Sequence, residues 1–344
     1  MQLINLIGEY LQDYMHEFPN TGTKLIFTGS NPIPVEFFQK RVLNRPELRT
    51  THEEADVIIV QRMVHLASKV DSIKVVCDDT DVFVLLMYFY VTEKLACNVY
   101  MENTSAPKVV IDIRASVDNN KVLICNLPAA HALSGSDTTS SLFGIGKTTI
   151  VKVLKSGPSL SSLGNIVSDI DIVLEESSRF ICQCYMFGSV NGGTMSDFRY
   201  QIWTHKMARK NITSAPELKS IPPTSEAFKQ HVLRAHNQTI IWKSALLQDP
   251  PQLERAEFGW VKDSSNEFVP LMVPHGIEAA PDSVLKLIRC GCCSSLPCKS
   301  PRCTCFVAKL SCSVFCSCAG FDDCCNECTK QKMLLIMTQI LKMK

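Results

Sequence analysis

The sequence lacks an excess of charge, a long apolar run and a basic leader segment. Lysine and arginine total 35 against 34 aspartate and glutamate residues, so any nucleic-acid partner must be bound by a local patch. The longest apolar run, Val82 to Val91, is too short to span a bilayer as a helix. The N-terminal segment carries Glu9 and Asp13 among its apolar residues, which predicts an amphipathic helix instead of a signal peptide. These absences favour a soluble intracellular protein with no membrane partner.

A complete nucleotide-binding loop is also absent. The stretch SSLFGIGKTT, Ser140 to Thr149, ends like a phosphate-binding loop, because Gly146, Lys147 and Thr148 supply its last positions. The loop requires a glycine five residues before Gly146, and Ser141 stands there. We therefore do not expect this segment to bind a nucleoside triphosphate.

Cysteine is sparse over most of the chain and dense near its end. Of 17 cysteines, 12 lie between Cys290 and Cys328. Without a secretory leader, such clustering favours thiolate metal binding over a disulfide scaffold. Repeated C-x-C pairs favour a shared zinc cluster with bridging sulfurs over separate zinc ribbons. The predicted zinc ligands are Cys290, Cys292, Cys298, Cys303, Cys305, Cys312, Cys316, Cys318 and Cys324.

The order C-x-C, C, C-x-C-F in this array resembles the tesmin-type CXC domain, a zinc-dependent DNA-binding module. The resemblance covers about residues 289–328 and implies DNA as the partner, with Lys299 and Arg302 as candidate contacts. Members of that family usually have a tyrosine before the second C-x-C pair, where this chain has Arg302. An arginine can enter a narrow minor groove. The alternative is a zinc cluster that only stabilises the fold of this segment.

Periodicity divides the rest of the chain into an α/β part and a helical part. Residues 55–67 form a mostly apolar pattern typical of a helix, and a capping box at Thr51 to Glu54 is expected to start it. A second long helix is expected after Thr224, with an apolar face that includes Trp242. Strands are predicted at residues 24–28, 73–77 and 107–113, which together with the helices predicts a largely parallel sheet.

Acidic residues gather where these strands end and helices begin. Glu53, Glu54 and Asp56 precede or open one helix, Asp78, Asp79 and Asp81 follow a buried strand, and Asp112 and Asp137 stand further along. Ligands of open α/β sheets collect at the carboxyl ends of strands. Converging carboxylates repel one another and favour a hard cation such as Mg²⁺ or Mn²⁺. The alternative is that these acids only cap helices.

The segments EEAD, CDDTDVFVLL and HALSGSDTTSSLFGIGKTT resemble the core of flap-endonuclease-type nucleases of the PIN-like fold, over about residues 51–155. They also resemble uncharacterised animal proteins with HALTGCDTTS-like motifs. The resemblance implies that metal is held by the carboxylates of Glu54, Asp56, Asp79, Asp81 and Asp137. It further implies a DNA-binding hairpin in which Gly144, Gly146 and Lys147 meet a phosphate at a helix N-terminus.

The family carries two further metal-binding aspartates in its N-terminal half, whereas the residues before Thr51 include only Asp13. The nuclease-like domain is therefore expected to be incomplete at its N-terminal part, or to be retained as a binding platform without turnover. Residues two apart do not share a helix face, so Glu53 remains an alternative to Glu54 as the partner of Asp56. His131 on an apolar helix is expected to be a packed side chain.

Together these patterns predict an α/β fold with a PIN-like parallel sheet and flanking helices. The expected regions are a nuclease-like domain at 1–155, a helical region at 156–245, a linker at 246–286 and a zinc domain at 287–330. The expected activity is metal-dependent phosphodiester hydrolysis of structured DNA. The alternative is a DNA-binding or chromatin-associated factor without enzymatic activity. Either role would place the protein in the nucleus.

Overall fold

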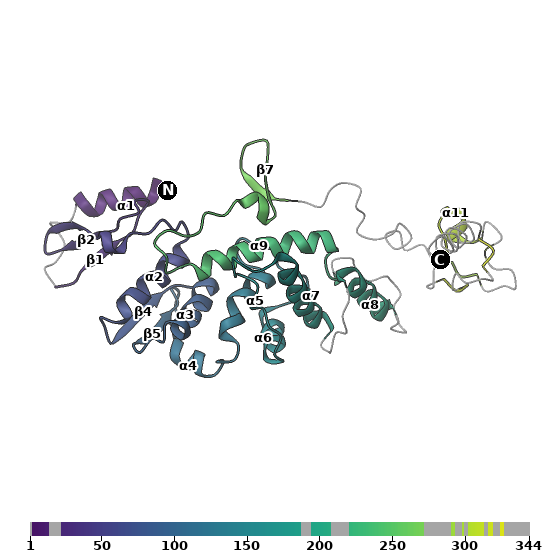
Figure 1. The fold of residues 1–344 in the computed structure, drawn as a ribbon, viewed down its shortest axis with the longest axis horizontal. Coiled ribbons are helices and arrows are strands. Elements are labelled where there is room, and N and C mark those ends of the chain that lie inside the picture. The colour runs from purple at the N-terminus through teal and green to yellow at the C-terminus, as the bar shows by residue number, and fades with distance from the viewer. Residues whose placement is uncertain are drawn as a thin grey trace. The chain divides into compact units, whose positions relative to one another are not determined.

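The computed structural model describes residues 2–13, 22–186, 194–207 and 220–271, followed by 290–292, 298, 302–312, 316–318 and 324–326. These residues belong to two units (Figure 1). The larger comprises Met1–Ala208 and Glu217–Met272, and the smaller comprises Arg209–Pro216 and Val273–Lys344. Within the described ranges, no helix is both long and apolar enough to cross a membrane.

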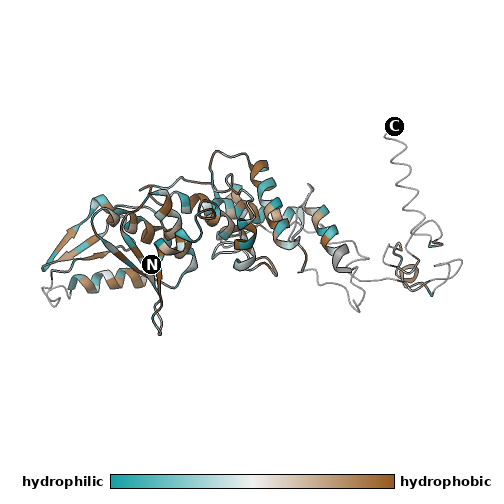
Figure 2. Ribbon diagram, turned by 90° about the horizontal axis from the view of Figure 1, so that it is seen from below, coloured by the Kyte–Doolittle hydropathy of each residue, from teal (hydrophilic) through white to brown (hydrophobic). Residues whose placement is uncertain are grey.

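The larger unit begins with an amphipathic helix and a small antiparallel sheet. The helix is α1 (Gln2–Asp13), and the sheet has the order β1 (Leu25–Phe27), β2 (Val35–Phe38) and β3 (Arg41–Asn44), followed by the short 3-10 helix η2 (Pro46–Leu48). The expected strand at 24–28 is present as β1. The buried Glu36 of β2 pairs with Arg45, which lies just after β3. Apolar side chains of α1, such as Leu3 and Leu6, are exposed, and in Figure 2 this helix beside the label N carries brown segments between teal ones.

The second sheet is mixed, which corrects the expected largely parallel arrangement. Its strands are β4 (Ser72–Val76), β5 (Asn98–Glu102) and β6 (Val110–Asp112), and β4 pairs with β5 in parallel through the crossover helix α3 (Thr80–Thr92). The strand β6 pairs with β5 in the antiparallel direction. The connection from β5 to β6 spans only residues 103–109, which is too short for a crossover. The strand predicted at residues 107–113 contains β6, whereas the periodicity of the sequence did not predict β5.

Helices cover this sheet and continue beyond it as one packed body. They are α2 (Ala55–Ala67), α4 (Ile113–Asp118), η3 (Ile124–Asn126), α5 (Leu127–Ser134), α6 (Lys147–Lys155), α7 (Ile170–Met186), α8 (Met195–Met207) and α9 (Ser225–Lys243). One apolar core runs from Val57 on α2 to Ala245 after α9, so it continues without a break across residue 155. Figure 1 shows α9 running alongside α5 and α7.

The expected start and apolar face of the long helix are confirmed. The side-chain oxygen of Thr224 accepts a hydrogen bond of 3.3 Å from the backbone N–H of Ala227, so Thr224 caps α9. Phe228, Val232 and Trp242 are all buried. After α9, the stretch expected to be loop-rich contains a 3-10 helix and a hairpin, namely η5 (Arg255–Phe258), β7 (Trp260–Lys262) and β8 (Phe268–Pro270). Among the described residues of the smaller unit, regular structure is limited to α11 (Thr304–Val307).

A close backbone contact locks α9 against the loop that follows α6. Gly164 has φ +80°, and its N–H donates to Nδ1 of His236 at 2.9 Å. A Cβ atom at Gly164 would lie 2.2 Å from Cγ2 of Thr239, which is buried on α9. Only glycine satisfies both the conformation and the space at this point.

We expect Gly164→Ala to lower the free energy of unfolding of the larger unit by about 2–4 kcal/mol, because strain at positive φ adds to the overlap with Thr239. Gly144→Ala is the matched control, because Gly144 has φ +77° but no atom within 4 Å of an added Cβ. It should cost only about 1 kcal/mol. Urea unfolding of both variants measures the difference, and equal losses would show that the contact with α9 is unimportant.

Candidate metal centres

Carboxylates from separate segments meet near the N-terminal ends of α2 and α3. Asp56 lies in the first turn of α2, Asp79 is the N-cap of α3, and Asp81 lies in the first turn of α3. One carboxylate oxygen from each of these three residues lies within 4.8 Å of the other two. This acidic triad therefore unites residues that the sequence separates by a helix and a strand.

The pKa of Asp56 is affected by the charges of the other predicted carboxylates. Partial burial, followed in order by the charges of Asp79, Asp81, Glu54 and Asp137, raises the pKa of Asp56 to about 6. Each of these four charges is close enough to act on Asp56 through space, and the oxygens of Asp79 and Asp81 lie within 4.8 Å of it. Asp137 itself is exposed in the loop after α5. The five carboxylates are called the acidic site below.

Two carboxylates of the acidic site are fixed by hydrogen bonds around α3. The side chain of Asp79 accepts from the backbone N–H of Asp81 at 2.8 Å, as an N-cap should. Oδ1 of Asp81 lies 2.6 Å from Nε2 of His131, and both side chains are buried. His131 is thus packed and satisfied as expected, but its partner is a residue of the acidic site. Nothing in the local sequence around His131 predicts this partner.

Glu54 is held by α9. Nε2 of Gln238 donates to both carboxylate oxygens of Glu54, at 3.0 and 2.9 Å. Burial raises the pKa of Glu54, and the hydrogen bond from Gln238 opposes that rise. The indole of Trp242, one turn further along α9, also lowers this pKa, although its buried N–H has no hydrogen bond of regular geometry.

The structure distinguishes Glu54 from Glu53. Glu54 is the N-cap of α2 and has an extended backbone with φ −84° and ψ 126°. The rule that residues two apart leave a helix face therefore does not apply to Glu54 and Asp56. Glu53 is exposed and lies 3.7 Å from a guanidinium nitrogen of Arg255. Glu54 is accordingly the member of the pair that reaches the acidic site.

The other acids and the predicted capping box have local roles. Asp78 accepts hydrogen bonds from the backbone and the hydroxyl of Thr104, and these bonds lower its pKa. Asp112 caps α4 by accepting from the N–H of Ala115 at 3.0 Å. The capping box is not formed, because the helix begins at Ala55 and the Thr51 hydroxyl bonds to residues 248 and 249 instead.

The Gly-Ile-Gly-Lys hairpin opens α6, and its lysine turns inward. Gly146 is the N-cap of α6, and a Cβ at Gly144 or Gly146 would meet no atom within 4 Å. The Lys147 ammonium donates to the carbonyl oxygens of His131 and Gly135 and to the hydroxyl of Ser134, at 3.2, 2.7 and 2.9 Å. Burial of the ammonium lowers the pKa of Lys147 to about 8, against the opposing effect of Asp81. The Lys147 ammonium, which was predicted to contact a phosphate, is thus bonded to three oxygens of the protein.

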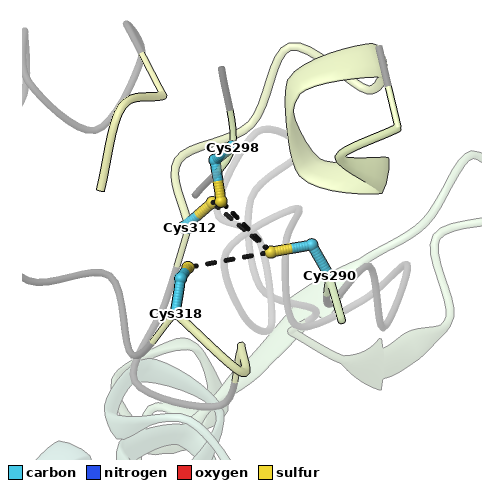
Figure 3. A group of neighbouring side chains, drawn as sticks. All are labelled: Cys290, Cys298, Cys312 and Cys318. Atoms are coloured by element: carbon cyan, nitrogen blue, oxygen red, sulfur yellow. Dashed lines mark hydrogen bonds between the residues drawn. The ribbon is translucent and has the colours of Figure 1, made fainter. Parts of the chain in front are cut away.

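The second candidate centre lies in the smaller unit. All nine cysteines predicted as zinc ligands lie in one cluster, with Phe306 of the C-x-C-F motif packed against it. Figure 3 shows the sulfurs of Cys290, Cys298, Cys312 and Cys318 directed toward one another, with Cys290 Sγ 3.5, 3.9 and 3.7 Å from the other three. Desolvation raises the pKa of Cys298. Burial therefore favours the neutral thiols, and a bound cation would favour their ionised form as metal ligands.

A buried asparagine supports the sulfur cluster. Asn326 is fully buried, and its Nδ2 donates to Sγ of Cys312 at 3.3 Å and to the carbonyl oxygen of Leu310 at 2.9 Å. Such donors orient metal-binding thiolates and stabilise their charge. Sequence analysis missed Asn326 because nothing in the C-x-C spacing marks it. Of the two predicted DNA contacts here, Arg302 is exposed and Lys299 lies outside the described residues.

No protein-family model, curated protein or solved structure matches this chain. The two centres therefore stand on their geometry alone. The clustered cysteines and the acidic triad could each hold metal ions. Their donors differ in kind, because thiolate sulfur suits zinc and carboxylate oxygen suits Mg²⁺ or Mn²⁺.

We expect protein purified under reducing conditions to contain zinc, and Cys290→Ser to lose most of it. Cys290 is the test position because it belongs to each group of four sulfurs that could hold an ion. Cys125→Ser is the control, because Cys125 is exposed in the larger unit. Elemental analysis by mass spectrometry gives the zinc content per chain. A zinc content near zero in the unaltered protein would contradict the sulfur cluster as a metal centre.

We expect Asp56→Asn to stabilise the protein in buffer without Mg²⁺ or Mn²⁺. The pKa of Asp56 is about 6 in the folded state and 3.8 in the unfolded chain, so ionised Asp56 destabilises the fold. This penalty is absent below about pH 4 and grows as the pH rises to about 6. At pH 7 the gain should be about 1 kcal/mol, allowing for partial exposure.

Thermal melts at pH 4 and pH 7 measure this gain. Asp78→Asn is the control, because its carboxylate has a lowered pKa and its neutralisation should give no gain at pH 7. A gain from Asp56→Asn that is equal at both pH values would show that charge repulsion is not its cause.

Proposed function

We propose that this chain binds DNA and that its acidic site hydrolyses phosphodiester bonds with Mg²⁺ or Mn²⁺. The convergence of carboxylates on Asp56 carries the proposal. A fold that holds like charges together loses stability, and such an arrangement is common at functional sites. Helix capping alone would not require Asp56, Glu54 and Asp137 to lie near the two acids of α3.

The arrangement of elements supports a PIN-like fold for the larger unit. The parallel pair β4 and β5 is joined by the crossover helix α3, and Asp79 and Asp81 follow the carboxyl end of β4. This is the edge at which ligands of α/β sheets bind. Two features differ from that family. The strand β6 is antiparallel, and two aspartates that the family carries in its N-terminal half have no counterpart before Thr51.

The donor set suits a hard divalent cation. Asp56, Asp79 and Asp81 would hold the ion, and the charges of Glu54 and Asp137 would add to its attraction. A bound ion would polarise the phosphodiester and lower the pKa of a bound water. His131 fixes Oδ1 of Asp81, which leaves Oδ2 of that carboxylate for a ligand.

Two other regions would bind the DNA. The N-terminus of α6 is open at Gly144 and Gly146, so backbone N–H groups could approach a phosphate there. With Lys147 engaged internally, the amides and not the ammonium would make this contact. The cysteine cluster with Arg302 would supply a second DNA-binding element, as the resemblance to the CXC domain implies. A DNA partner would place the protein in the nucleus.

A DNA-binding factor without enzymatic activity is the second candidate. The inward-turned Lys147 favours it, because the lysine of the hairpin is engaged by oxygens of the protein and so does not meet the phosphates of a substrate. In that case the larger unit would act as a scaffold, and the cysteine cluster would bind the DNA.

Cleavage of labelled flap, bubble and duplex DNA with Mg²⁺ or Mn²⁺ tests the proposal. We expect the unaltered chain to cleave and Asp79→Asn/Asp81→Asn to lose at least 100-fold in rate, since both carboxylates belong to the triad. Asp78→Asn should retain activity, because Asp78 bonds to Thr104 outside the triad. Binding without cleavage by folded, zinc-loaded protein would support the second candidate. If the folded, zinc-loaded protein neither bound nor cleaved DNA, that result would contradict both candidates.

A further inference from the structure

The helix α9 is unusual because it is buried and polar at the same time. His231, Arg234, His236, Asn237 and Gln238 are all buried within it. Buried polar side chains need partners, and each partner on α9 shows what the helix holds in place. Nε2 of His231 lies 2.8 Å from the carbonyl oxygen of Leu133 at the end of α5. Nδ1 of His236 accepts from Gly164 at 2.9 Å.

Gln238 differs from these residues because one of its partners is a carboxylate of the acidic site and the other lies next to one. Its Nε2 donates to the two carboxylate oxygens of Glu54 at 3.0 and 2.9 Å. Its Oε1 accepts from the hydroxyl of Thr138 at 2.7 Å. Thr138 directly follows Asp137 in the loop after α5. One amide group thus connects the segments that carry two carboxylates of the acidic site.

We propose that Gln238 is a positioning residue that holds Glu54 and the Asp137 loop together at the acidic site. This inference rests on the proposed function for its purpose, because the bridge matters to catalysis only if the carboxylates bind metal. The bridge makes α9 a part of the site, although α9 lies about 100 residues from Asp137 in the sequence.

The chemistry of the amide explains why glutamine suits this position. Glu54 presents only acceptors when it is ionised, and the Thr138 hydroxyl can donate. An amide side chain supplies a donor for the first and an acceptor for the second, which also fixes the orientation of its nitrogen and oxygen. A carboxylate at position 238 would repel Glu54, and an apolar side chain would leave Glu54 without this donor and break its link to Thr138.

The loop that carries Asp137 is closed on itself by backbone hydrogen bonds between Ser136 and Thr139, and side-chain contacts tie this turn to the rest of the larger unit. The ammonium of Lys147 holds the carbonyl oxygen of Gly135 at one end of the loop. The hydroxyl of Thr139 donates to the carbonyl oxygen of Ala132 at 2.7 Å at the other end. Between them, Gln238 supplies the contact to Thr138 that ties the exposed Asp137 segment to the rest of the site.

Manganese binding and hydrogen exchange together test the bridge. Gln238→Met keeps the size of the side chain and removes its hydrogen bonds, and Thr138→Val removes only the hydroxyl donor. Gln183→Met on α7 is the matched control, because the buried Oε1 of Gln183 has no hydrogen-bond partner among the described residues. Mn²⁺ alone is titrated by electron paramagnetic resonance into zinc-loaded full chain, with Asp79→Asn/Asp81→Asn as the reference for binding elsewhere.

We expect Gln238→Met to weaken Mn²⁺ binding about 10- to 100-fold, the range for supporting residues of metal sites. Thr138→Val should weaken it less. Both variants should speed amide exchange in residues 136–142, and Gln183→Met should change neither quantity. If Gln238→Met does not fold, Thr138→Val decides, because Thr138 is exposed and its loss cannot unfold the core.

The outcomes separate this inference from the proposed function. Unchanged exchange and unchanged Mn²⁺ affinity in folded Gln238→Met would overturn the bridge. Faster exchange in both bridge variants, with no Mn²⁺ uptake by the unaltered chain above the reference, would support the bridge as a structural link. That same result would contradict a metal-dependent acidic site.

Discussion

The candidate acidic site depends on holding several partly buried carboxylates together against their mutual repulsion. Three of the five are fixed by a donor from the protein: Asp79 by a backbone N–H, Asp81 by His131 and Glu54 by Gln238. Among the described residues, no donor bonds to Asp56, and the pKa of its carboxyl group is raised to about 6. The fold therefore supplies donors to three of the carboxylates and none to Asp56. A cation would bind there because it would offset the uncompensated negative charge.

Local patterns in the sequence were sufficient to place two of the longer helices. The helix at 55–67 and the start of α9 after Thr224 match, because an apolar stripe and a capping residue are properties of neighbouring residues. The partners that orient the acids could not be predicted in this way. His131 and Asp81 are 50 residues apart, and Gln238 and Glu54 are 184 apart, so their contacts depend on how helices pack. The strand β5 was missed for a similar reason, because its role is set by its neighbour β4.

Lys147 shows the limit of a short motif. The Gly-Ile-Gly-Lys sequence correctly marks the start of a helix, because glycines determine the local backbone. The direction of the lysine depends on the nearby end of α5, whose carbonyl oxygens attract a cation. The same ammonium thus fixes the loop that leads to Asp137, which is a structural use of a charge that the motif suggested for DNA.

The two candidate centres relate to folding in opposite ways. In the larger unit an extensive apolar core already exists, and the acidic site adds repulsion to it. In the smaller unit, the buried cluster among the described residues consists of cysteines, and regular structure there is limited to four residues of α11. A core of thiols offers little apolar surface, so a metal ion bound by these sulfurs would add stability that hydrophobic burial does not supply there. Metal binding at the sulfur cluster would therefore favour folding of the smaller unit, whereas metal at the acidic site would bind to a unit that already has an apolar core.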